Sequence, residues 1–85
     1  MKEFTYVITD PLGIHARPAG QLVKEAGKFS SLCTLTKGNK TEKLTRLMGI
    51  MLLAVKHGDV VTVRADGEDE DMAIRTLQVF FQENL

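Results

Sequence analysis

Three short segments of the 85-residue chain alternate apolar with polar side chains, and this period of two is the feature that most constrains the fold. They cover residues 4–8, 33–36 and 61–65, and a fourth short strand over 40–43 can follow the Gly38-Asn39 turn as the second arm of a hairpin. Strands that alternate in this way bury one face of their sheet and leave the other in water. All helices must then pack on the same face, which predicts an open two-layer α+β sandwich.

Three helical segments separate these strands. The first begins near Ala16 and stops at Gly27, and the second runs over 44–55, is apolar on almost every side, and has Gly58 in position to end it. We expect Asp69 to cap the third, whose buried stripe is Ala73, Leu77, Phe80 and Phe81. The element order is therefore βαββαβα, in one domain over residues 1–85.

Composition argues against several classes of protein. Eleven basic and eleven acidic side chains give a net charge of zero, and there is no Trp, so nucleic-acid binding is not expected. The single cysteine, Cys33, cannot form an internal disulfide and suits a reducing compartment. No segment resembles a signal peptide, and the longest apolar run is far shorter than the roughly 20 residues of a membrane span. We expect a cytoplasmic protein without membrane insertion.

The zero net charge hides a division along the chain. Residues 1–64 carry ten basic and five acidic side chains, a net charge of +5. Residues 65–85 carry one basic and six acidic side chains, a net charge of −5, most of it between Asp66 and Asp71. The rest of the surface is therefore basic and could receive an anionic ligand or the acidic face of a partner.

One of the two histidines has unusual neighbours, in the segment Gly13-Ile14-His15-Ala16-Arg17-Pro18-Ala19. Proline is favourable in the first turn of a helix, so Pro18 places His15 at the cap. The unpaired backbone N–H groups of Ala16 and Arg17 would then form an anion site, to which the Arg17 guanidinium adds a planar cation suited to phosphate. A neutral imidazole nitrogen beside such a site is a nucleophile that could accept a phosphoryl group.

A simpler alternative is that His15 only caps the helix and Arg17 is a solvated charge. His57 is expected to have such a structural role, at the end of the middle helix, where an imidazole complements exposed carbonyls. No set of His, Cys and acidic residues has metal-ligand spacing, and Cys33 faces the predicted core. We predict no metal and no cofactor.

A second segment of interest begins at Arg46 and continues with apolar residues through Leu53. A short helix on an open sandwich cannot bury every side, so some of Leu47, Met48 and Met51 should stay exposed. Flexible methionines suit adaptable partner surfaces, although these side chains could equally fill the core.

Together these segments resemble the HPr family of phosphocarrier proteins from the bacterial phosphotransferase system. The resemblance runs almost end to end, and its most specific part is the segment from Gly13 to Ala19. Two further segments match, Lys43-Leu44 with Leu47–Met51, and Ala65–Glu70. The resemblance implies an open-faced β-sandwich: a four-stranded antiparallel sheet with three helices on one face.

The resemblance also implies a function. His15 would carry a phosphoryl group on Nδ1, received from enzyme I charged by phosphoenolpyruvate and passed to the IIA unit of a sugar permease. Arg17 would stabilise the phosphate, and Leu47, Met48 and Met51, with Arg46 beside them, would dock both partners. We expect a monomeric phosphocarrier rather than an independent enzyme.

The chain departs from the family at two positions. Many members have a regulatory serine where this chain has Arg46, and a small or polar residue where it has Leu12. Serine-type phosphorylation should therefore be absent. Two other functions stay open: a regulatory protein-binding module of the same fold, and a carrier in a dedicated nitrogen-related or dihydroxyacetone kinase phosphorelay.

Overall fold

Four strands form one antiparallel sheet, as predicted: β1 (Lys2–Val7), β2 (Leu32–Lys37), β3 (Lys40–Lys43) and β4 (Val60–Asp66). Their order across the sheet is β1-β4-β2-β3. The computed structural model describes all of residues 1–85. Phe4 lies opposite Val63, and Val63 lies opposite Leu35, so apolar side chains form continuous rows across three strands.

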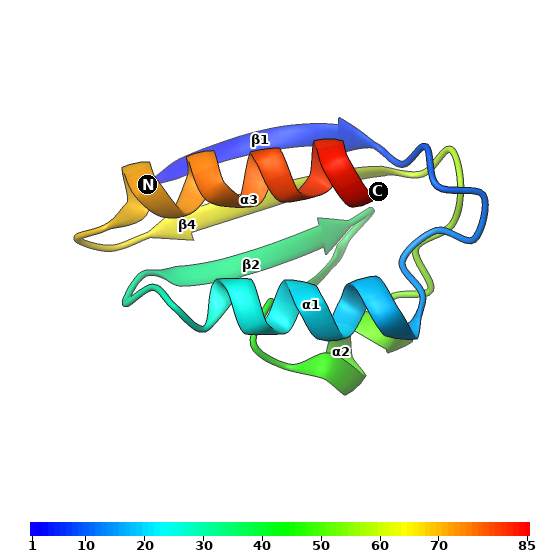
Figure 1. Cartoon of the computed structure of the whole chain (residues 1–85), viewed down its shortest axis with the longest axis horizontal. Helices are drawn as coiled ribbons and strands as arrows, with labels where there is room; N and C mark the ends of the chain where they lie inside the picture. The colour runs from blue at the N-terminus through cyan, green and yellow to red at the C-terminus, as the bar shows by residue number, and fades with distance from the viewer.

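Three helices, α1 (Ala16–Ala26), α2 (Leu47–Leu52) and α3 (Glu70–Asn84), cover a single face of this sheet (Figure 1). Phe81 of α3 is fully buried, and the rings of Phe4 and Tyr6 in β1 meet it edge-on at centroid distances of 5.6 Å. The predicted stripe of α3 is buried except for Phe80, which is only partly covered. The open-faced α+β sandwich is confirmed.

The middle helix is shorter than the sequence indicated. Its expected span was 44–55, but α2 contains only Leu47–Leu52. Leu44 belongs to the hairpin, because its N–H donates to the carbonyl of Cys33 at 2.9 Å. At the other end Ala54 has φ 51°, a left-handed conformation that cannot continue a helix.

The prediction for His57 was therefore wrong. This residue is exposed and lies in the turn before β4, five residues beyond the last residue of α2. The carbonyls after α2 are instead bound by Lys37, whose Nζ donates to Leu53 at 3.3 Å and Ala54 at 2.8 Å. Sequence inspection missed Lys37 because it lies in a strand far from α2 along the chain.

Asp69 occupies the N-cap position of α3, as predicted, but its side chain makes no capping hydrogen bond. Its carboxylate accepts the N–H groups of Ser30 and Ser31, both at 2.9 Å, and the hydroxyl of Ser31. The Ser31 hydroxyl, followed by the Ser30 N–H, lowers the pKa of Asp69 below its ordinary value of 3.8. Asp69 thus ties the loop before β2 to the start of α3.

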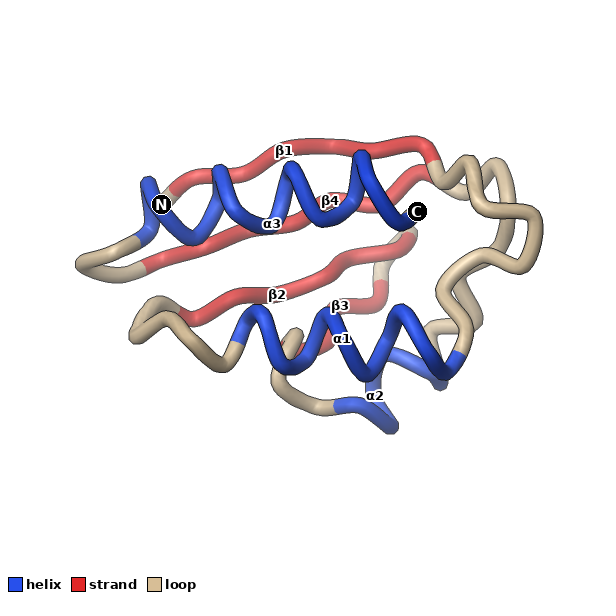
Figure 2. The backbone as a smooth tube through the Cα atoms, in the orientation of Figure 1, coloured by secondary structure: helices blue, strands red, loops and turns tan.

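Two loops run side by side at one end of the molecule, from β1 to α1 and from α2 to β4 (Figure 2). Ile8 and Gly58 connect them at the strand ends, since the Gly58 N–H donates to the Ile8 carbonyl at 2.8 Å. Farther along, the Ile14 N–H donates to the Val55 carbonyl at 3.0 Å. The acidic turn between β4 and α3 lies at the opposite end of the long axis (Figure 1).

Candidate functional site

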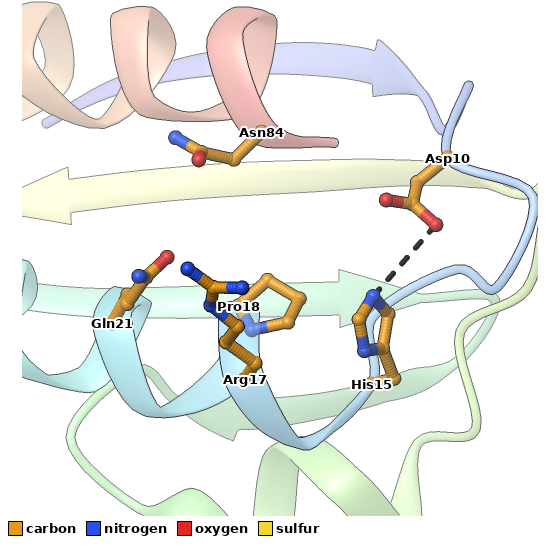
Figure 3. Close-up of a pocket in the computed structure, with 6 residues that line it drawn as sticks. All are labelled: Asp10, His15, Arg17, Pro18, Gln21 and Asn84. Carbon is orange, nitrogen blue, oxygen red and sulfur yellow. Dashed lines mark ion pairs between the residues drawn. The ribbon is translucent and has the colours of Figure 1, made fainter.

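A shallow pocket of ≈ 210 Å³ lies where α1 begins, and no hydrophobic side chain lines it. It brings together His15 and Arg17, the two residues that the sequence singled out for chemistry (Figure 3). Its remaining lining residues are Asp10, Pro18, Gln21 and Asn84. Sequence reasoning missed Asn84, because only the folded chain brings the end of α3 to the start of α1.

Gly13 shapes the loop that carries His15. It has φ 68°, and a Cβ atom there would clash with the Val55 carbonyl and approach the Cα of Lys56 to 2.7 Å. Its N–H donates to the Asp10 carbonyl at 3.0 Å, which closes a turn just before His15. Only glycine combines this conformation with such close contact to the neighbouring loop.

His15 is the N-cap residue of α1, yet its side chain makes no capping hydrogen bond. The imidazole therefore remains free, and the simpler alternative of a side-chain cap does not describe its geometry. Its Nε2 lies 3.8 Å from Oδ1 of Asp10, while Nδ1 points away from Asp10, on the side of the ring nearer α1 (Figure 3). The His15 side chain is 38% exposed, so another molecule can reach it.

The first turn of α1 offers unused hydrogen-bond donors beside this ring. The helical bonds begin with Ala19, whose N–H donates to the His15 carbonyl at 3.0 Å, and the N–H groups of Ala16 and Arg17 donate to nothing within the protein. The guanidinium of Arg17 makes no ion pair; in Figure 3 it lies between Gln21 and His15. Together these donors can bind an anion at the helix start.

The predicted docking segment is only partly exposed. Arg46 is the exposed N-cap residue of α2, Leu47 is 42% exposed and Met48 69% exposed. Met51 is half-buried and packs against the core. The sequence missed Leu52, which is 75% exposed and lies four residues after Met48 on the same side of the helix.

Other chemistry finds no support in the side chains present. Cys33 is buried, and desolvation raises the pKa of its thiol above the ordinary value of 9.0, which opposes formation of a reactive thiolate. No three His, Cys, Asp or Glu side chains gather where they could hold a metal ion. None of the helices has the length and apolarity needed to cross a bilayer.

A family model described as the PTS HPr component phosphorylation site matches residues 2–83. The chain belongs to the HPr family. A phosphocarrier protein HPr of Mycoplasma capricolum subsp. capricolum is 45% identical over 78 residues, which are 92% of this chain and 88% of that protein. Like its family, the chain is a phosphocarrier component of the phosphotransferase system.

Solved HPr structures share its fold closely. A Mycoplasma histidine-containing phosphocarrier protein superposes with a TM-score of 0.94 at 41% identity, covering 96% of this chain and 93% of the other. An HPr from Thermoanaerobacter tengcongensis gives 0.93 at 43% identity, covering 98% and 93%. A structure of an HPr dimer from the same organism gives 0.78 at 43% identity, covering 98% and 95%.

Proposed function

We propose that Nδ1 of His15 accepts a phosphoryl group from enzyme I charged by phosphoenolpyruvate and passes it to the IIA component of a sugar permease. The single observation that carries this proposal is the arrangement at the start of α1. There the His15 imidazole, whose Nδ1 has no protein partner, lines the same pocket as the unpaired guanidinium of Arg17 and adjoins the unused N–H groups of Ala16 and Arg17.

In the transfer step the Nδ1 lone pair attacks phosphorus and forms an N–P bond. The bond between phosphorus and the donor atom breaks, and its electron pair leaves with the donor. The phosphate oxygens are then held by Arg17 and by the N–H groups of Ala16 and Arg17, which complement their charge. Transfer to the acceptor reverses these changes, so His15 needs no metal or cofactor.

Partners would dock on α2 next to this site. Leu47, Met48 and Leu52 supply exposed apolar area, and Arg46 adds a permanent positive charge at the start of the helix. Met51 contributes less, because it is half-buried against the core. We expect enzyme I and IIA surfaces to present acidic residues around an apolar patch. Their association rates should therefore fall as salt concentration rises, because salt screens exposed charges.

Labelling with enzyme I and ³²P-phosphoenolpyruvate tests the site. The wild type and His57→Ala should acquire one acid-labile phosphate, and His15→Ala none. His57 is the matched control because it is the only other histidine, is exposed, and its ring makes no hydrogen bond or ion pair. Undiminished label in His15→Ala would refute the proposal, and so would its loss in His57→Ala alone.

The proposed setting is the cytoplasm, where a monomer would shuttle between enzyme I and IIA. Onward transfer distinguishes a sugar pathway from a dedicated phosphorelay. Phosphorylated protein mixed with sugar-specific IIA domains should lose its label to at least one of them. Transfer only to a nitrogen-related acceptor or a dihydroxyacetone kinase subunit would contradict the sugar assignment, and sedimentation velocity would test the monomer.

A further inference from the structure

We propose that Asp10 is a positioning residue for His15, whose carboxylate keeps the imidazole proton on Nε2 and so leaves Nδ1 free to accept a phosphoryl group. The proposal rests on the proposed function of His15 and adds a residue that its chemistry requires. Asp10 reaches the ring from the loop after β1, whereas Arg17 approaches from α1 (Figure 3).

The backbone of Asp10 is fixed from two directions. Its N–H donates to the main-chain oxygen of Leu85 at 2.8 Å, and its carbonyl accepts the Gly13 N–H at 3.0 Å. The neighbouring Thr9 binds the same Leu85 oxygen through its N–H and its hydroxyl. The end of α3 therefore holds Asp10 in place against the pocket.

The side chain of Asp10 is fixed as well. Its Oδ1 accepts the Leu12 N–H at 2.8 Å, which orients the carboxylate, and the same oxygen lies 3.8 Å from Nε2 of His15. This separation is that of an ion pair rather than a direct hydrogen bond. The Asp10 side chain is 24% exposed, so water screens the interaction only in part.

A neutral imidazole has one proton, and the group facing each nitrogen decides which one holds it. The negative charge of a carboxylate beside Nε2 favours the tautomer in which Nε2 is protonated, because a proton is attracted to a nearby anion. The only other charged side chain that lines the pocket is Arg17, and a cation does not favour a proton near itself. Both charges therefore favour a lone pair on Nδ1.

Phosphorylation strengthens the role of Asp10. When Nδ1 bonds to phosphorus and the donor leaves with its electron pair, Nε2 keeps its proton and the ring becomes a cation. The Asp10 carboxylate then faces that cation at ion-pair distance. Partly exposed ion pairs have energies that correspond to a factor of about two to five in an equilibrium constant. Asp10 should thus favour the phosphorylated form by this factor.

Two variants separate charge from structure. Asp10→Asn keeps an Oδ1 acceptor for the Leu12 N–H and removes only the charge, whereas Asp10→Ala removes both. Nitrogen-15 shifts of the two imidazoles, recorded in alkaline solution, report the tautomers. His57 is the internal reference, because no side chain pairs with its ring.

In the wild type, His15 should hold its proton on Nε2 to a greater extent than His57 does. In both variants the tautomer ratio of His15 should approach that of His57. If the tautomer ratio of His15 is the same in Asp10→Asn as in the wild type, the proposal is overturned. Asp10 would then have only a structural role, as the acceptor of the Leu12 N–H. A wild-type ratio equal to that of His57 also overturns it.

A second measurement uses the phosphorylated state. Enzyme I is allowed to equilibrate phosphate between ¹⁵N-labelled wild type and unlabelled Asp10→Asn, and intact mass spectrometry counts each phosphorylated form. The wild type should hold about two to five times more phosphate; an equal share contradicts the stabilising role. If no form takes up phosphate, the proposed function fails, while the tautomer measurement still decides the role of Asp10.

Discussion

Gly13 is the residue at which the loop carrying His15 meets the loop after α2. Gly13→Ala places a methyl group against the Val55 carbonyl at φ 68°, so it should destabilise the fold by about 3 kcal/mol and displace His15. Gly38→Ala is the control, because φ is 62° there but no atom lies near the added methyl group. It should cost about 1 kcal/mol. Urea unfolding measures both, and equal losses would show that crowding at Gly13 contributes nothing.

The resemblance to the HPr family implies that Arg46 stands where many members have a regulatory serine, and Arg46 has no hydroxyl to phosphorylate. Incubation with HPr kinase and ATP should therefore add no phosphate to residue 45 or 46, as judged by mass spectrometry of peptides. An HPr with the serine shows that the kinase is active, and Arg46→Ser should restore an acceptor in this chain. Phosphate on Thr45 of the wild type would contradict the prediction.

Lys37 stabilises the C-terminal end of the short helix α2. Lys37→Met removes the donor for the carbonyls of Leu53 and Ala54 and the ion pair with Asp59 at 3.0 Å. Since hydrogen bonds to charged groups are stronger than neutral ones, stability should fall by about 1–2 kcal/mol, and amide exchange in α2 should accelerate. Lys40→Met is the control, because Lys40 is exposed and its side chain has no partner. Equal unfolding midpoints for the two variants would exclude this role.

At the level of elements, sequence periodicity was sufficient for the sheet, for α1 and for α3. Alternation in the strands determines which face is buried, and Pro18 and Gly27 mark where α1 begins and ends. The extent of α2 could not be predicted, because its end depends on Lys37, which is distant in sequence, and on an unusual conformation at Ala54. A uniformly apolar segment gives no periodicity from which to read a boundary.

The site, like the fold, could be predicted from the sequence only in part. His15 and Arg17 line the same pocket because they are only two residues apart at the start of α1. Their proximity therefore follows from the sequence alone. The contribution of Asn84 depends on how α3 packs, and the contact of Asp10 with His15 depends on the conformation of the turn at Gly13. Local sequence therefore indicates the proposed reacting group, while the residues around it in the pocket depend on the tertiary structure.

Across the whole molecule, three carboxylates with lowered pKa values make the free energy of unfolding depend on pH. Hydrogen bonds from Ser31 and Ser30 lower the pKa of Asp69, those from Lys56 and Lys37 lower that of Asp59, and those from the Met1 ammonium group and Gly67 lower that of Glu70. A carboxylate whose pKa is lower in the folded state than in the unfolded state stabilises the fold at pH values above its unfolded-state pKa. This stabilisation is lost as the pH falls through its folded-state pKa.

The free energy of unfolding should therefore decrease as the pH falls below about 4.5, the ordinary value for glutamate. Urea titrations between pH 7 and pH 2.5 measure this decrease. Asp69→Asn should lower stability at neutral pH and flatten the decrease. Glu68→Gln, which changes an exposed neighbour without a side-chain partner, should change neither. An unaltered pH profile in Asp69→Asn would contradict the assignment.

The acidic turn at 66–71 and the pocket of His15 lie at opposite ends of the long axis, in a chain whose net charge is zero. Such a molecule is an electric dipole, and a charged partner turns it before any contact forms. Phosphorylation adds a phosphoryl group with about two negative charges at the end away from the acidic turn, and the cationic ring offsets part of this charge. The net negative charge added there reduces the dipole moment. The unphosphorylated and phosphorylated forms should therefore orient differently in the electric field of the same partner. Each partner can thus distinguish the two forms before contact.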